Sequence, residues 1–267
     1  GQIHTLSTPA SMGLLQELVT EPVKPWDAVV CSSQAGKAVV ETVMQDREEQ
    51  LLNRLNINDL KVLERPYLPV IPLPIATNHI RDELPSKTCA RKELEIDDNS
   101  HVVLWLGRLS MLTKADPWPT YLVLQKAALA LNKPLVLIEC GPDDTAPQAK
   151  HFAKLRSLCP DVQFVRFGGE EPVSDQIKYQ CLAASDIAIS LVDNTQETFG
   201  LSVAEAMASG LPVVASNWNG YRDLVRDGID GFLIPTQWSL LANDFSTRLG
   251  WASSLGVINY PMAAGCL

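Results

Sequence analysis

Two glutamates lie eight positions apart in a stretch that is otherwise almost uncharged. Glu205 is the only charged residue between Glu197 and Arg222. A lone carboxylate among Leu, Val, Ala and Met is costly to bury unless hydrogen-bond donors reach it. The two hydroxyls of a ribose would supply such donors, as they do for the acidic residue of dinucleotide sites. Capping of its own helix, or an ion pair with a distant arginine, would equally account for Glu205.

The segment between the two glutamates has the features of an anion-binding turn. A strand expected over 187–192 is followed by a polar loop, and a helix is expected to start near Gly200. Free N–H groups and a partial positive charge at a helix N-terminus attract anions, and ligands of open parallel sheets bind at the carboxyl ends of the strands. Glycine at this point lets the backbone approach a ligand closely.

The elements that must position these residues follow from an alternation that starts at His101. Short β-branched runs alternate with helix-length segments, which is typical of βαβ units around a parallel sheet. We expect strands over 102–106, 135–139, 162–167, 187–192, 212–215 and 232–234, and helices over 120–131, 148–158, 175–184, 201–209 and 221–226. Residues 98–267 are therefore expected to form a doubly wound, Rossmann-like α/β domain.

Residues 1–75 are too few for a complete α/β domain. A strand is expected over 28–31, and Ser32 or Ser33 is placed to cap a helix that runs to about Leu55. A proline-rich stretch over 65–75 predicts an extended crossing segment, and 76–97 is expected to be a linker. Both ends of the sequence look cut, so we interpret 1–75 as the tail end of a larger N-terminal domain and 98–267 as truncated at its C-terminus.

The composition argues against several classes of protein. The 267 residues carry 22 Lys and Arg against 31 Asp and Glu, a formal net charge of −9. Because affinity for nucleic acids comes from clustered basic side chains, no nucleic-acid partner is expected. No apolar run reaches the roughly 18 to 20 residues of a membrane-spanning helix, and we expect a cytoplasmic protein. The 6 cysteines form no C-x-x-C pair, which favours buried free thiols over a zinc site.

The string from Glu197 to Ala215 resembles the signature of retaining GT-B glycosyltransferases of family 4. It carries the paired glutamates, a Phe-Gly-Leu turn and Ala-Met-Ala-Ser-Gly-Leu-Pro-Val-Val-Ala, and Asp-Gly-Ile-Asp-Gly-Phe-Leu-Ile-Pro follows from Asp227. The resemblance extends over 4 to about 235. It implies a GT-B fold in which 98–267 binds a nucleotide-sugar donor and 1–75 belongs to the acceptor-side domain.

The resemblance implies a role for each matching residue of this string. Glu205 would bind the ribose hydroxyls of a nucleotide diphosphate sugar, and Glu197 would contact the donor sugar. The backbone N–H groups of Phe199, Gly200 and Leu201 would face the sugar and the β-phosphate.

Further matching residues come from three other segments. Gly107, Arg108 and Lys114 resemble the family's Gly-Arg…Lys element, whose cations hold the pyrophosphate and would stabilise a leaving diphosphate. His4 would lie near the donor sugar, and Gly168 would pass its backbone near the base. Judged without the resemblance, the two cations are equally consistent with surface charge, the histidine with an exposed side chain and Gly168 with a strand-end turn.

The sequence departs from the family pattern in three places. Pro74 stands where the family has a glycine before an aspartate, which affects the interdomain hinge, and Ala115 replaces a common glycine after Lys114. The Gly-rich loop and acceptor-binding strands that open the family's N-terminal domain are also absent. We expect a missing portion of roughly 100 to 150 residues.

The resemblance implies a hexosyltransferase-type enzyme that moves a sugar from a nucleotide diphosphate sugar to an acceptor hydroxyl with retention of configuration. The transition state should resemble an oxocarbenium ion, and the resemblance implies that the departing phosphate helps to deprotonate the acceptor. We expect neither a cofactor nor a metal, because the sequence shows no metal-ligand cluster. The donor base and sugar, the acceptor (saccharide or lipid-linked), the oligomeric state and peripheral contact with a membrane stay open.

Two alternatives belong to other classes. A nucleotide-sugar-binding fragment or pseudoenzyme without an acceptor site would keep the donor pocket but show no turnover. A Rossmann dehydrogenase would need Gly-x-Gly-x-x-Gly after the first strand, and the residues from Gly107 to Ser110 do not supply it.

Overall fold

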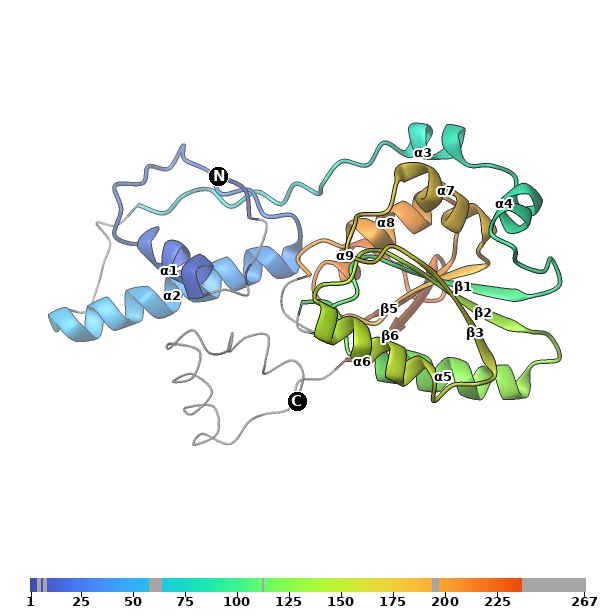
Figure 1. The fold of residues 1–267 in the computed structure, drawn as a ribbon. Helices are drawn as coiled ribbons and strands as arrows, with labels where there is room; N and C mark the ends of the chain where they lie inside the picture. The colour runs from blue at the N-terminus through green and yellow to red at the C-terminus, as the bar shows by residue number, and fades with distance from the viewer. Residues whose placement is uncertain (4–5, 7–8, 58–63, 112, 194–196, 237–267) are drawn as a thin grey trace.

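The computed structural model describes residues 1–3, 6, 9–57, 64–111, 113–193 and 197–236. A smaller N-terminal part with two helices is joined by an extended segment to a larger part that holds the sheet (Figure 1). The elements are, in chain order, α1 (Pro9–Glu17), α2 (Gln34–Leu55), α3 (Thr77–Glu83), α4 (Lys87–Glu93), β1 (His101–Leu106), α5 (Pro117–Ala130), β2 (Leu135–Cys140), α6 (Ala146–Arg156), β3 (Val162–Phe167), α7 (Asp175–Ala184), β4 (Ile187–Ser190), α8 (Leu201–Ala208), β5 (Val213–Ser216), α9 (Tyr221–Leu224) and β6 (Gly231–Ile234).

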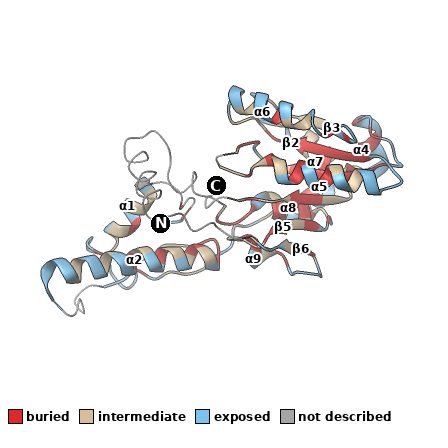
Figure 2. Cartoon of the chain, turned by 90° about the horizontal axis from the view of Figure 1, so that it is seen from below, coloured by how far each residue is buried: buried red, intermediate tan, exposed pale blue. Residues whose placement is uncertain are grey.

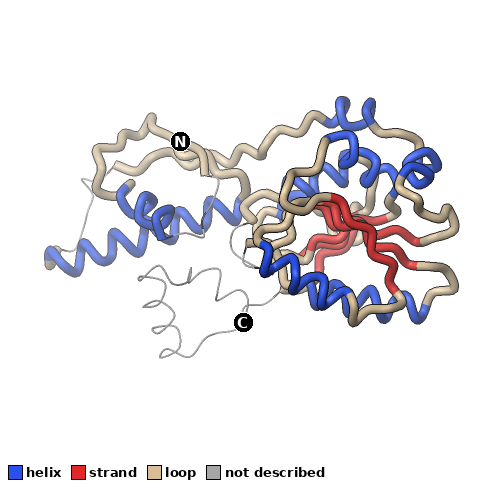
Figure 3. The backbone as a smooth tube through the Cα atoms, in the orientation of Figure 1, coloured by secondary structure: helices blue, strands red, loops and turns tan. Residues whose placement is uncertain are grey.

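The larger part is built on a 6-stranded sheet with the order β3-β2-β1-β4-β5-β6, drawn red in Figure 3. All neighbouring strands are parallel. The chain moves outward from β1 to β3 and then returns to place β4 beside β1, so the strand order reverses between β1 and β4. The expected doubly wound α/β architecture is confirmed, and each strand expected after His101 is present with only small shifts of its ends.

The sheet is covered by helices on both faces, and its strands β2 and β5 consist largely of buried residues, drawn red in Figure 2. Alternate side chains of β1 enter two different hydrophobic clusters. Val102 and Leu104 pack with residues of α3, α4, α7 and α8. Val103 and Trp105 pack with residues of α5 and α6. Burial on both faces explains why these strands read in the sequence as continuous apolar runs.

Two helices begin earlier than the sequence pattern predicts. The helix expected over 120–131 starts at Pro117, because the Asp116 side chain accepts a hydrogen bond from the N–H of Trp118. The helix expected over 148–158 starts two residues early in the same way, with Thr145 as its N-cap. In both, a proline occupies the first turn, where its missing N–H costs nothing.

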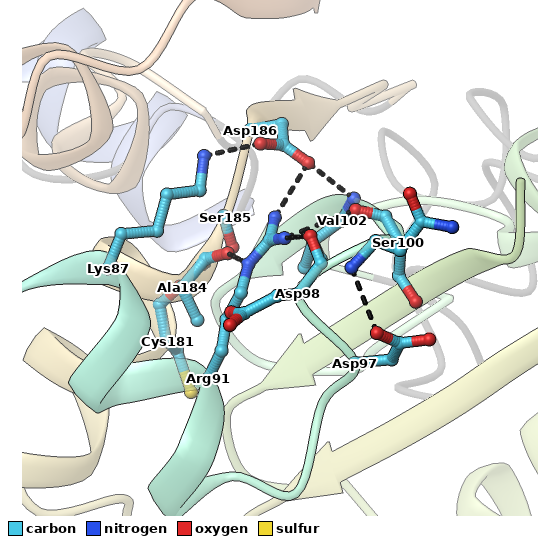
Figure 4. A network of polar contacts seen from close by, with 11 residues as sticks. Lys87, Arg91, Asp97, Asp98, Ser100, Val102, Cys181, Ala184, Ser185 and Asp186 are labelled. Atoms are coloured by element: carbon cyan, nitrogen blue, oxygen red, sulfur yellow. Dashed lines mark hydrogen bonds and ion pairs between the residues drawn. The ribbon is translucent and has the colours of Figure 1, made fainter.

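The segment 76–97, expected to be a linker, instead forms α3 and α4 and packs against the sheet domain. Arg91 of α4 is buried, and its Nε donates to the carbonyl oxygen of Ala184 over 3.0 Å. Its Nη2 lies 2.9 Å from Asp186 Oδ2, and the same oxygen accepts the N–H of Val102 (Figure 4). This network anchors α4 to the amino ends of β1 and β4, so the segment belongs structurally to the larger part.

The strand expected over 28–31 is not a regular strand. Its residues make only isolated parallel bridges, one of them to Gln2 and two to the proline-rich segment. Cys31 donates its N–H to the carbonyl oxygen of Pro69 and accepts the N–H of Ile71, both over 2.9 Å. Because prolines cannot donate, this pairing is interrupted and no continuous ladder forms. Ser33, one of the two expected caps, does cap α2 by accepting the N–H of Gly36.

Four cysteines are buried free thiols, as expected, and Cys89 is an exposed one. Cys266 lies outside the described residues. Among the helices that the structure describes, none has the length and apolar character needed to cross a bilayer. Trp26 is exposed on the N-terminal part, whereas Trp118 and Trp218 are partly buried.

Candidate functional site

A cavity of about 560 Å³ lies at the carboxyl ends of the strands, where the strand order reverses. Its walls come from the loops after β1 and β2, from α7 with the loop before it, and from the β4–α8 segment. Ile3 and Leu73 of the N-terminal part complete it, so the cavity lies between the two parts of the chain. Eight of the predicted site residues line it: Gly107, Arg108, Lys114, Glu197, Phe199, Gly200, Leu201 and Glu205.

The loop after β1 is held in place by the loop after β2. Leu109 donates its N–H to the carbonyl oxygen of Pro142 over 2.9 Å, and Ser110 Oγ donates to Asp144 Oδ2 over 3.0 Å. Arg108 comes directly before these two anchors, with its guanidinium 3.5 Å from Asp144 and half of its side chain exposed. The loop therefore presents a cation that a ligand can reach from the cavity.

Lys114, at the other end of this loop, forms an ion pair with Glu197 across the cavity. The distance from Lys114 Nζ to Glu197 Oε2 is 2.6 Å, and only 11% of the glutamate side chain is exposed. The resemblance assigns these two residues to different parts of a donor, the pyrophosphate and the sugar. Their pairing shows that both face the same space and that their opposite charges offset each other.

Asp193 ties the Lys114 loop to the end of β4. Its N–H donates to the Lys114 carbonyl oxygen over 3.3 Å, and its Oδ2 accepts the N–H of Asp116 over 3.0 Å. Its Oδ1 is buried without a hydrogen-bond partner in the part of the chain that the structure describes. Burial raises the pKa of this carboxyl group to about 6, against the opposing effect of the Asp116 N–H. Asp193 is not among the residues that the sequence pattern predicts for the site.

The start of α8 requires glycine for two reasons. Gly200 has a φ of 104°, in the left-handed region that side chains rarely adopt. A Cβ there would also lie 2.4 Å from the ring of Tyr221. Tyr221 is itself fixed, because it is buried and its hydroxyl lies 2.6 Å from Ser190 Oγ. This packing sets the position of the turn from Phe199 to Leu201 that lines the cavity.

Glu205 lies in the second turn of α8, and its carboxylate meets a lysine that the sequence analysis missed. Lys178 Nζ of α7 is 3.0 Å from Glu205 Oε1. The described structure therefore shows neither a self-capping glutamate nor a pair with an arginine. The topology did allow this contact to be expected. The helix that follows β3 starts at the same edge of the sheet as α8, so a lysine in its first turns can lie near Glu205.

Two predicted site residues are not among those that line the cavity. His4 lies outside the described residues. Gly168 follows β3, and a Cβ on it would lie 2.1 Å from the carbonyl oxygen of Gly141. A Cβ on Gly141 would in turn lie 2.0 Å from the carbonyl oxygen of Gly107. Glycine at 141 and 168 thus allows the ends of three neighbouring strands to stay in close contact.

The described residues contain no group of three or more His, Cys, Asp and Glu side chains arranged to hold a metal ion. Metal independence stays a prediction, to be tested by activity.

Comparisons with known proteins agree on one family. The family described as glycosyl transferases group 1 matches residues 100–248. The D-inositol 3-phosphate glycosyltransferase of Xylanimonas cellulosilytica is 27% identical over 260 residues, which cover 96% of this chain and 57% of the relative. That of Mycolicibacterium vanbaalenii is 30% identical over 167 residues, covering 57% of this chain and 35% of the relative. The chain spans about half the length of the curated relatives that it matches over most of its own length.

Solved structures show the same architecture. Anabaena HepE in complex with UDP-glucose has a TM-score of 0.58 and 18% identity, covering 99% of this chain and 65% of that one. The sucrose-phosphate synthase of Thermosynechococcus elongatus has a TM-score of 0.58 and 17% identity, with coverage of 99% and 61%. Identities this low show the fold alone, and the fold is the GT-B type that the motifs predict.

Proposed function

The chain belongs to the family of glycosyl transferases group 1, and from this premise we propose that it transfers a sugar from a nucleotide diphosphate sugar to an acceptor hydroxyl. The observation that carries the proposal is the convergence of Glu205, Glu197, Lys114 and Arg108 on one cavity. Its volume of about 560 Å³ lies within the range of about 300 to 1,000 Å³ that is usual for small-molecule sites.

The charges of the cavity suit the parts of such a donor. Arg108 and Lys114 offer two cations beside the N-terminus of α8, which favours a diphosphate at that wall. Glu205, farther along α8, is placed to accept hydrogen bonds from the ribose hydroxyls. The structure of Anabaena HepE was determined with UDP-glucose, which supports a nucleotide sugar as the donor class for this fold.

The proposed mechanism is a retaining transfer in which the protein stabilises charge. As the bond from the anomeric carbon to the diphosphate breaks, the sugar becomes oxocarbenium-like and negative charge grows on the departing phosphate. Arg108 and Lys114 stabilise that charge, while the Glu197 carboxylate contacts the sugar. The departing phosphate accepts the proton of the acceptor hydroxyl on the same face. Two side-chain cations at the leaving group are the reason that we propose a metal-independent reaction.

The experiment that tests this function is turnover of a nucleotide diphosphate sugar. The chain is incubated with UDP-glucose, GDP-mannose and ADP-glucose, with and without EDTA, and released nucleoside diphosphate is measured. Release that persists in EDTA and disappears in Glu197→Gln supports the proposal, and the anomeric configuration of the product follows from NMR. Binding of donor without any turnover would instead favour the alternative of a donor-binding protein without catalysis.

A further inference from the structure

We infer that Lys178 is a positioning residue for ribose recognition, which holds the Glu205 carboxylate in the orientation that accepts the ribose hydroxyls. The inference rests on the proposed function and extends it to a residue outside the family motif. Lys178 and Glu205 both line the cavity, and they come from different helices, α7 and α8. Their ion pair is therefore a contact made by the fold and not by neighbours within one helix.

The ammonium of Lys178 is fixed from three directions. It lies 3.0 Å from Glu205 Oε1 and 3.0 Å from Asp175 Oδ1. It also lies 5.3 Å from the centroid of the Tyr179 ring, within the range of a cation–π contact. Burial alone would lower the pKa of Lys178, but the hydrogen bonds to Asp175 and Glu205 outweigh it and raise the pKa, so the ammonium stays charged.

Partial burial makes this ion pair more effective than one on the surface. The exposed fractions of the Lys178 and Glu205 side chains are 22% and 25%, whereas that of Asp175 is 78%. Charges that are partly removed from water interact more strongly, while exposed pairs contribute little. Glu205 should therefore be held mainly by Lys178, and Asp175 should contribute less because it faces solvent.

The pair leaves Glu205 able to bind a ribose. A carboxylate offers about four acceptor positions, and Lys178 uses one oxygen, Oε1. The two hydroxyls of a ribose need two of the remaining positions. Lys178 and the ribose therefore do not compete, and the lysine removes rotational freedom that ligand binding would otherwise have to restrict.

Lys178 has a different proposed role from Arg108 and Lys114, the cations that we assign to the diphosphate. Arg108 and Lys114 come from the loop after β1, and Lys114 pairs with Glu197. Lys178 is carried by α7, which starts at the Ser174 cap and buries Tyr179, Cys181 and Leu182 against the sheet domain. Among the described residues, its ammonium contacts Asp175, Glu205 and the Tyr179 ring and makes no hydrogen bond or ion pair with the loop after β1.

The test measures how much more tightly the chain binds a nucleoside diphosphate than its counterpart that lacks the 2′ and 3′ hydroxyls of the ribose. Calorimetry gives the dissociation constants of UDP, GDP and ADP and of their 2′,3′-dideoxy counterparts. In the wild type we expect the ribo form to bind at least about tenfold more tightly, since two hydrogen bonds to a carboxylate are lost without it. Lys178→Met should reduce this preference several-fold, Lys178→Arg should retain most of it, and Asp175→Asn should change it little.

Matched variants separate this role from others. Lys114→Met should weaken ribo and dideoxy forms alike and keep their ratio, whereas Lys154→Met, an exposed lysine on α6, should change neither. In a Glu205→Ala background, Lys178→Met should have no further effect on the ratio. A ratio unchanged in Lys178→Met, or equal weakening of both forms, overturns the inference while leaving the proposed function standing. If no nucleotide binds the folded wild type, the proposed function fails and this inference with it.

Discussion

The ammonium of Lys114 lies 2.6 Å from the carboxylate of Glu197, although the residues are 83 positions apart in the chain. The proposed reaction needs this cation at the diphosphate and this carboxylate at the sugar. In the structure they bind each other, so we expect the proposed donor diphosphate to compete with Glu197 for Lys114. Glu197 thereby holds the Lys114 ammonium at the wall of the cavity.

Replacing Glu197 by glutamine should strengthen product binding and abolish turnover. The neutral amide competes less with a diphosphate for Lys114, so we expect the dissociation constant of the nucleoside diphosphate to fall about two- to tenfold, a change of order 1 kcal/mol. The rate of sugar release should fall at least about 100-fold. Calorimetry and a product-release assay measure the two effects. Weaker diphosphate binding in Glu197→Gln would contradict competition between Glu197 and the diphosphate for Lys114. Glu49→Gln, on the exposed face of α2, is the control.

Replacing Gly200 by alanine should destabilise the chain and disturb the cavity. The added Cβ meets the buried ring of Tyr221 at 2.4 Å, and the backbone has a φ of 104°. We expect a loss of about 2 to 4 kcal/mol in the free energy of unfolding, measured with urea. Gly13→Ala in α1 is the control, because nothing lies within 4 Å of its Cβ position. A Gly200→Ala variant as stable as Gly13→Ala would show that the turn is not constrained in this way.

Asp193 should make stability depend on pH between about 4 and 6. Burial raises the pKa of its carboxyl group from 3.8 to about 6 in the folded chain. The folded state therefore keeps the proton longer than the unfolded state, and stability is lost as the pH rises through this window. Allowing for its partial exposure, the loss amounts to about 2 kcal/mol.

Asp193→Asn isolates this effect from other titrating groups. Urea unfolding of the wild type and the variant is compared at several pH values. As the pH rises from about 4 to 6, the unfolding free energy of the wild type should fall relative to that of the variant. Above this range the difference between the two should stay constant. A difference independent of pH would show that Asp193 titrates as in an unfolded chain.

Arg91 should contribute to stability and not to ligand binding. It is buried and donates to the carbonyl oxygens of Ala184, Asp98 and Ser100 as well as pairing with Asp186. Arg91→Met should cost about 3 kcal/mol, because it leaves these acceptors and a partly buried carboxylate without their donor. Lys87 pairs with the same aspartate but is 47% exposed, so Lys87→Met should cost less than about 1 kcal/mol.

Nucleotide affinity should be unchanged in the folded fraction of both variants. The Arg91 network lies at the amino ends of β1 and β4, the edge of the sheet opposite the cavity. Equal destabilisation by Arg91→Met and Lys87→Met, or a loss of nucleotide affinity in either, would contradict this assignment.

Strands and long helices were predictable here because burial on both faces leaves a clear sequence pattern. The strands β1 (His101–Leu106) and β2 (Leu135–Cys140) are apolar almost throughout, and the structure pairs them in parallel. The starts of α5 and α6 were predicted too late in the chain. Asp116 and Thr145 set these starts as N-caps, each through a single side-chain hydrogen bond, and the spacing of apolar residues along a helix gives no sign of such a bond.

The segment 76–97 was misread because its two helices have only 7 residues each, too few for a helical period to stand out. Arg91 is held by a carbonyl oxygen 93 positions away, which no local pattern reveals. Lys178 was missed for the same reason. Its partner Glu205 was recognised as a buried charge that needed a donor, but the donor comes from a helix that only the fold brings beside α8.

The binding of a nucleotide ribose by Glu205 is tested most directly by the effect of Glu205→Ala on the thermal stability of the chain with UDP, GDP, ADP and NAD⁺. A ligand at about 100 times its dissociation constant should add about 2.7 kcal/mol to the free energy of unfolding. We predict that one nucleoside diphosphate stabilises the wild type and that Glu205→Ala loses most of this stabilisation, whereas Glu49→Ala retains it. Stabilisation by NAD⁺ alone, or nucleotide binding that is indifferent to Glu205→Ala, would contradict the account.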